Sequence, residues 1–195
     1  MEFEYSEPKK EIPTQEKIEF SFDSEESFVR LEQWLKKFLD NEGAEQLVFV
    51  LQSMAEESFL NQCQDATQEL GKRLAEQFGG EESFFDLVPG AKYSDARASG
   101  SLEKIGRHGL DYHSVGLLEM RSNDGKSFAI ILDLTFGAVS GKGSRKSVLA
   151  MHSLGNREKS LDTLKNNYGG KWEVDYEYDK KTGKFVFCLG QRRKR

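Results

Sequence analysis

The chain has 195 residues, which suits a single domain, and its formal net charge is -5. This acidic balance argues against non-specific binding to nucleic acid, which depends on Lys and Arg meeting phosphates. No apolar run approaches the roughly 18 residues needed to span a membrane. The start of the chain, "MEFEYSEPKKEIPTQEK", lacks the basic-then-apolar pattern of a secretion signal. We therefore expect no membrane contact, and a protein that is cytoplasmic or exported without an N-terminal signal.

Charged residues, prolines and scattered aromatics in residues 1–22 predict an extended arm with room for one edge strand. Apolar residues then recur at helical spacing through 23–40, with Asp23 or Ser24 as the candidate N-cap. Residues 41–43 are expected to end this helix. Similar spacing predicts a second helix directly after them.

A third helix is predicted within "SFLNQCQDATQEL" and beyond. Asn61 can serve as its N-cap, and Gln64 stands three residues later, which is the arrangement of a capping box. This places Cys63 in the first turn, where unpaired backbone amides and the helix dipole favour a thiolate. The pair of glycines at 79–80 is expected to end the helix.

The second half of the sequence has the patterns of strands. Residues 80–109 are rich in Gly, Ser and Asp and predict a long loop of the kind that shapes a site. After them we expect a hairpin turning at "NDG", a strand at "SVLAMHSL", a helix at "NREKSLDTLKNNYGG", a second hairpin at "KWEVDYEYDKKTGKFVFCLG" and a solvated basic tail at 191–195. Helices followed by an antiparallel sheet predict one α+β domain over 23–190, with the N-terminal helices packed on the sheet.

The first hairpin permits a test of geometry. A three-residue Asn-Asp-Gly loop, with a type I turn and a left-handed glycine, pairs residues whose numbers sum to about 248. His113 and Asp133 then share one face of the sheet as diagonal neighbours, within reach of each other. A two-residue loop would shift the register by one and send the two side chains to opposite faces. We favour the three-residue loop.

Asp133 lies in the apolar stretch "AIILDLTF" and needs a partner, because unpaired burial of a charge is costly. His113 is the natural one. A carboxylate would orient the imidazole and stabilise its charged form, and the second ring nitrogen could then take a proton from a thiol. Cys63 is the candidate thiol.

The stretches "NQCQDA", "YHSVGLLE" and "LDLTF" together resemble the papain-like and transglutaminase-like thiol enzymes, in which a cysteine opens a helix and a histidine and an Asp or Asn follow on strands. The resemblance covers roughly residues 58–140 and is nearest to small bacterial papain-fold toxins and effectors, several of which are glutamine deamidases. It implies a papain/transglutaminase-like core. The sequence departs from the pattern at Glu57, where papain-type enzymes carry a glutamine, and in having no Gly or Trp beside Cys63.

The expected function is a hydrolase or acyltransferase acting on a glutamine side chain or peptide bond of a protein or peptide. Cys63 would be the nucleophile, His113 the base and then the acid, and Asp133 the residue that orients His113. The Cys63 backbone amide, Gln62 and Gln52 are the candidate oxyanion donors. This chemistry requires no cofactor and no metal.

Three other interpretations remain open. Cys63 also fits an apolar helical stripe, so the chain could be a non-catalytic interaction module: an adaptor, an immunity-like partner or an inactive relative. A metal site at His108, Asp111 and His113 would lack a fourth ligand. The tail "QRRKR" is short for a nucleic-acid site on an acidic protein.

Cys188 alternates within "KFVFCLG" and is expected in the core or on an edge strand.

Overall fold

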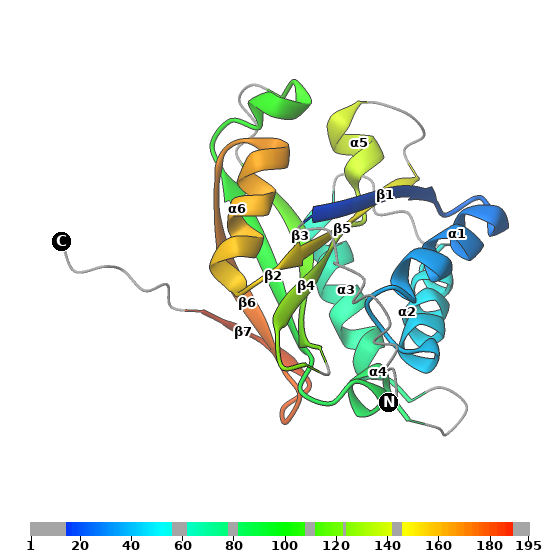
Figure 1. The fold of residues 1–195 in the computed structure, drawn as a ribbon. Helices are drawn as coiled ribbons and strands as arrows, with labels where there is room; N and C mark the ends of the chain where they lie inside the picture. Colours follow the sequence, from blue (N-terminus) through cyan, green and yellow to red (C-terminus); the bar gives the residue numbers. More distant parts are fainter. Residues whose placement is uncertain are drawn as a thin grey trace, which may run out of the picture.

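The computed structural model describes residues 15–55, 62–77, 82–107, 112–122, 124–141 and 146–188. These residues form an α+β fold, as predicted (Figure 1). The elements, in chain order, are β1 (Gln15–Ser21), α1 (Glu25–Leu35), α2 (Asn41–Ser53), α3 (Cys63–Ala75), α4 (Phe84–Leu87), β2 (Lys92–Ser99), the 3-10 turn η1 (Glu103–Ile105), β3 (Tyr112–Arg121), β4 (Ser127–Asp133), α5 (Phe136–Ser140), β5 (Ser147–Leu154), α6 (Arg157–Tyr168), β6 (Lys171–Asp179) and β7 (Lys184–Phe187).

The described strands form one seven-stranded sheet in the order β1-β5-β4-β3-β2-β6-β7. Every neighbouring pair is antiparallel. β2, β3, β4 and β5 lie beside one another in chain order. β1 comes from the segment predicted as an arm and forms one edge strand, and β7 forms the other.

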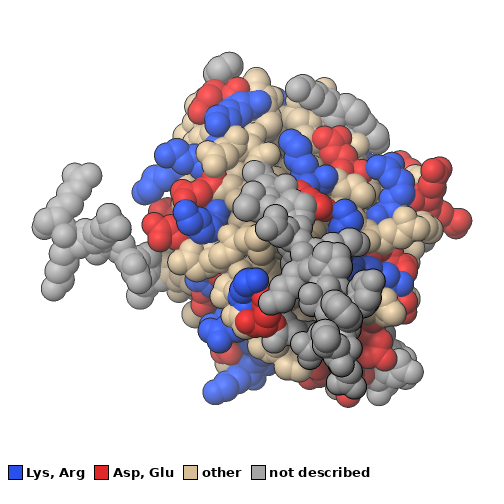
Figure 2. Space-filling view, viewed as in Figure 1, with Lys and Arg blue, Asp and Glu red and all other residues tan. Residues whose placement is uncertain are grey.

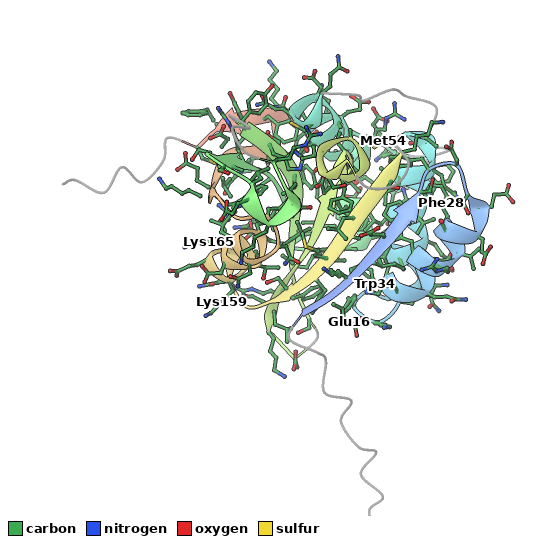
Figure 3. All side chains as sticks on the ribbon, turned by 90° about the horizontal axis from the view of Figure 1, so that it is seen from above. Glu16, Phe28, Trp34, Met54, Lys159 and Lys165 are labelled. Carbon is green, nitrogen blue, oxygen red and sulfur yellow. The ribbon has the colours of Figure 1, made fainter. Side chains whose placement is uncertain are left out.

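Two hydrophobic cores lie on the two faces of this sheet. The first combines residues of α1 to α4 with strand residues, among them Leu31, Leu70 and Leu118. The second combines Leu164 and Tyr168 of α6 with other residues of the same strands. In Figure 3, Phe28 and Trp34 of α1 lie on one side of β1 and β5, whereas Lys159 and Lys165 of α6 lie on the other. The sheet is therefore the middle layer.

The first helix ends earlier than predicted, and residues 36–40 separate it from the second. Ser24 caps α1 by accepting a hydrogen bond from the Ser27 amide at 3.2 Å. Residues 41–43 do not end this helix, which stops at Leu35. They begin α2 instead, because the Asp40 carboxylate accepts from the Gly43 amide at 2.8 Å and acts as an N-cap.

The prediction of a long irregular loop over 80–109 is wrong. The described part of this segment contains α4, η1 and β2, and β2 is an interior strand paired with both β3 and β6. Its sequence, "KYSDARAS", has small and polar residues where a buried strand usually has branched apolar ones. The backbone hydrogen bonds to β3 and β6 therefore stabilise this strand, whereas the intrinsic preferences of its side chains do not.

Tyr93 of β2 determines how closely α3 approaches the sheet. Its hydroxyl donates a 2.8 Å hydrogen bond to the Thr67 backbone carbonyl in α3. A Cβ added at Gly116 of β3 would lie 2.2 Å from the Tyr93 hydroxyl, and one at Gly71 of α3 would lie 2.6 Å from its ring. The two glycines therefore provide the space for Tyr93, which fixes α3 along β3.

The described surface mixes charges of both signs. On the face shown in Figure 2, Lys and Arg side chains are interspersed with Asp and Glu. None of the described helices has the length and apolar character required to cross a bilayer.

Substitution of Gly116 tests this packing. Gly116→Ala should lower the free energy of unfolding by about 1–3 kcal/mol, because the new methyl group collides with the Tyr93 hydroxyl. Urea unfolding measures the change. Arg121→Ala, on the same strand but exposed, is the control and should shift stability by less than about 0.5 kcal/mol. Equal effects from the two substitutions would contradict the proposed role of Gly116.

Candidate functional site

The β3–β4 hairpin adopts the register expected of a three-residue loop. Gly116 pairs with Leu132, and Arg121 pairs with Ser127. The Ser122 amide donates to the Lys126 carbonyl at 2.9 Å, and Gly125 has a φ of 80° in the left-handed region. The predicted register is confirmed by these pairings, although residue 123 of the turn lies outside the described part of the chain.

His113 and Asp133 lie on the same face of the sheet and form a buried pair. His113 Nε2 is 2.9 Å from Asp133 Oδ2, and both residues are 0% exposed. The Tyr168 hydroxyl donates to the same oxygen at 2.6 Å. The Thr135 amide donates to Oδ1 at 3.1 Å. Donors from β3, α6 and the end of β4 therefore hold the carboxylate in one orientation.

The thiol of Cys63 lies near the His113 ring. Cys63 lies in the first turn of α3, as predicted, and is 9% exposed. It is the first residue of the helix, because the N-cap is Gln62 and not Asn61 as predicted. Its side chain is close enough to interact with the imidazole by partial hydrogen bonding and by charge. Within the described residues, His113 Nδ1 completes no hydrogen bond of ordinary geometry. Nδ1 is therefore the ring nitrogen available to the thiol, because Nε2 is occupied by Asp133.

The charge state of His113 follows from its neighbours. Burial alone lowers the pKa of the ring, but the Asp133 carboxylate raises it by charge and by hydrogen bonding, and Cys63 adds to this effect. Together they raise the pKa of His113 from 6.5 to about 10. At neutral pH the ring is consequently an imidazolium.

The structure separates the two glutamines considered as oxyanion donors. Gln62 is the N-cap of α3, is exposed, and makes no side-chain capping bond. Gln52 is exposed near the end of α2, whose Ser53 carbonyl accepts from Arg73 at 2.6 Å. Arg73 is ten residues along α3 from Cys63, or about 15 Å at the rise of an α-helix. Gln52 thus adjoins a residue that is bonded to Arg73 of α3, and its role as an oxyanion donor stays a prediction.

The sequence did not reveal the aromatic residues around His113. The Tyr168 and Trp172 rings lie 5.8 and 6.1 Å from its ring, centroid to centroid. Burial and the nearby Asp133 raise the pKa of Tyr168 well above its usual value, so its hydroxyl stays protonated and can donate. The sequence indicates these residues only through the aromatic pair in "NYGGKW". That pair can be placed beside His113 only when the positions of α6 and β6 are known.

A second buried carboxylate, Asp95 of β2, was also missed. It is 0% exposed and lies on the face that α3 covers, which is the face opposite to His113 and Asp133. Burial raises its pKa to about 6, and the Ser114 hydroxyl opposes this shift. A protonated Asp95 is easier to accommodate in this position than a charged one.

The described residues contain no group of three or more His, Cys, Asp or Glu side chains arranged to hold a metal ion. His108 and Asp111, considered as ligands with His113, lie outside those residues.

Cys188 is half-buried and follows the edge strand β7. Its amide donates to the Asp175 carbonyl at 2.8 Å.

Comparisons with models of protein families, with curated proteins and with solved structures found no match to this chain. The candidate site is consequently argued from the geometry of its own residues.

The raised pKa of His113 predicts a dependence of stability on pH. The folded state binds a proton on His113 between pH 6.5 and about 10, and the unfolded state does not. This stabilisation is complete below pH 6.5 and is lost as the pH rises toward 10. Urea unfolding across this range should show falling stability in the wild type and a weaker slope in Asp133→Asn.

Asp175→Asn is the matched control for that measurement. Asp175 is also a buried carboxylate, but its partner is Arg97 at 3.0 Å, which stays charged throughout the range. The control should keep the wild-type slope. A wild-type slope in Asp133→Asn would show that the carboxylate does not control the charge of His113.

Proposed function

We propose that the protein is a thiol hydrolase or acyltransferase that acts on a glutamine side chain or a peptide bond. The observation that supports this most directly is the position of His113, held by Asp133 at Nε2 and close enough to Cys63 to interact with its thiol. This is the order of groups that nucleophilic catalysis requires: a nucleophile, a base and a residue that orients the base.

The roles of the three residues follow from this order. Cys63 attacks the acyl carbon as a thiolate, which the adjacent His113 imidazolium stabilises. The imidazolium then gives its proton to the leaving amine, so that a thioester remains on Cys63 and His113 is neutral. Neutral His113 deprotonates water, which attacks the thioester, releases the acid and restores the thiolate and the imidazolium. With an amine in place of water, the same steps give acyl transfer. Asp133 keeps the ring oriented and stabilises its positive charge throughout.

Two sources of oxyanion stabilisation are proposed near the thiol. Cys63 is at the first position of α3, where backbone amides have no acceptor within the helix. Its own amide is one donor candidate. The side chain of Gln62, exposed and without a capping bond, is the second.

The arrangement of elements supports the proposed papain/transglutaminase-like core. The cysteine opens a helix, and the histidine and aspartate lie on two adjacent antiparallel strands that follow in the chain. Helices α1 to α4 share their core with this sheet, in keeping with N-terminal helices packed on it. A protein or peptide substrate would reach the thiol at the N-terminal end of α3.

A non-catalytic interaction module is the second candidate, and burial favours it. His113 and Asp133 are 0% exposed, and Cys63 is 9% exposed. A buried Cys-His-Asp group of this kind can serve as a satisfied polar cluster that fixes α3, β3 and β4 together. The two candidates differ in the reactivity of the thiol.

Alkylation distinguishes them. Cys63 should react with iodoacetamide near neutral pH much faster than an ordinary thiol, because the imidazolium stabilises the thiolate. Cys188 is an internal control, since burial and the Glu177 carboxylate raise its pKa. Mass spectrometry of the digested protein gives both rates. His113→Gln should slow Cys63 at least tenfold and leave Cys188 unchanged. Equal, slow rates for the two cysteines would favour the interaction module.

The reaction itself can be followed on a mixture of glutamine-containing peptides. Deamidation adds about one mass unit and releases ammonia, whereas peptide hydrolysis yields fragments and acyl transfer to an added amine gives an adduct. We expect one of these products with the wild type and none with Cys63→Ser. Product formation that persists in Cys63→Ser would exclude this thiol as the nucleophile.

A further inference from the structure

A cavity of about 580 Å³ lies at the end of the sheet remote from Cys63. Its volume is within the range of roughly 300–1,000 Å³ that is typical of sites for small molecules. More than half of the residues that line it are apolar: Phe38, Leu39, Leu87, Val88, Pro89, Met120, Phe128 and Leu154. The position of β3 separates it from the thiol, because Met120 is seven residues from His113, or about 23 Å along a strand.

The cavity forms where the helical layer leaves the end of the sheet uncovered. Met120 and Phe128 face the same side of the sheet as the core formed with α1 to α4. At this end, however, the chain segments between α1 and α2 (37–40) and after α4 (87–89) border the sheet without filling the space above it. The result is a half-open extension of the hydrophobic core.

A buried histidine lies in the wall of this cavity. His152 of β5 is 1% exposed, and within the described residues its Nδ1 has no hydrogen-bond partner. Its ring stacks on Phe38 with centroids 3.9 Å apart, and Phe128 packs beside it at 5.6 Å. Burial lowers the pKa of His152 to about 4, so the ring is neutral near pH 7. A neutral imidazole stacked on Phe38 adds uncharged surface to the wall of the cavity.

The charged residues of the cavity favour an anion. Lys37, Arg121 and Lys126 contribute three positive charges, and Asp40 and Asp124 contribute two negative ones. Asp40 accepts from the Gly43 amide at 2.8 Å. Two of the cations are also engaged, Lys126 by Asp124 at 2.7 Å and Lys37 by Glu16 at 2.9 Å. Arg121 is exposed and, in the part of the chain described, has no ion-pair partner. It is the cation available to a ligand.

We propose that this cavity binds a small amphiphilic anion, an apolar chain or ring that carries one carboxylate. The apolar body would occupy the space between Phe38, Met120 and Phe128. The carboxylate would meet Arg121, and the His152 ring, stacked on Phe38, would form part of the wall against the apolar body. This site is independent of the proposed thiol chemistry, because it shares no residue with the Cys63–His113–Asp133 group.

Methionine methyl groups provide the readout. With methionine methyl-¹³C labelling, Met120 reports on the cavity, whereas Met54 and Met151 lie in the cores on opposite faces of the sheet. Octanoate and 3-phenylpropionate are the probe ligands. They distinguish a ligand whose apolar part is a chain from one whose apolar part is a ring. Octanol and octylammonium have the same chain length as octanoate with no charge or the opposite charge. Met120→Leu assigns the reporting signal.

Octanoate, 3-phenylpropionate or both should shift the Met120 signal to saturation and leave Met54 and Met151 in place. Octanol and octylammonium should bind at least fivefold more weakly than octanoate. Arg121→Gln should weaken octanoate binding about threefold, in line with an exposed ion pair. Leu154→Trp, which fills the cavity from the end of a strand, should abolish the shift, and Cys63→Ser should leave it unchanged.

Three results would overturn the proposal. They are the absence of a saturable shift at Met120 with either carboxylate, equal shifts at all three methionines, and binding of octanol as tight as that of octanoate. Because Arg121 is exposed, Arg121→Gln should fold normally and keeps the test valid if Leu154→Trp fails to fold. Loss of octanoate binding in Cys63→Ser would also contradict the independence of the two sites.

Discussion

The buried pair of His113 and Asp133 is the interaction on which the rest of the site depends. A lone carboxylate at this depth would be strongly destabilising, so the strand that carries Asp133 requires donors around it. The hairpin register provides His113, the turn after β4 provides the Thr135 amide, and α6 provides the Tyr168 hydroxyl. A shift of one residue in the hairpin would remove His113 from this face. The Asp133 carboxylate and its donors thus connect the sheet to α6.

A separate constraint brings the thiol to the same ring. Tyr93 fits against Gly71 and Gly116 and bonds to α3 at Thr67, one turn beyond Cys63. This contact holds α3 close along β3, so that the first residue of the helix lies near His113, the second residue of that strand. Asp133 and Tyr93 act from opposite faces, and their effects meet at the imidazole.

The sequence was informative where local rules decide the geometry. The Asn-Asp-Gly turn determines the register, and the register together with the charge in "AIILDLTF" predicts the His113–Asp133 pair. β2 was missed because long-range pairing on both edges holds it, and "KYSDARAS" carries no strand pattern. Tyr168 and Gln52 depend on how α6 and α2 lie in space, which local patterns do not determine. His113 lies beside Asp133 and close enough to Cys63 to interact with it, whereas the resemblance to thiol enzymes and the catalytic roles remain a proposal.

The protonation state of His113 tests the central claim most directly. The chain has three histidines, so ¹⁵N NMR of the imidazole nitrogens can be assigned with His113→Gln and His152→Gln. The account predicts that both nitrogens of His113 are protonated at pH 7 to 8, because Asp133 raises its pKa. Spectra in which His113 is a neutral imidazole at pH 7 would contradict the account, since neither the charge pairing with Asp133 nor the activation of Cys63 would then hold.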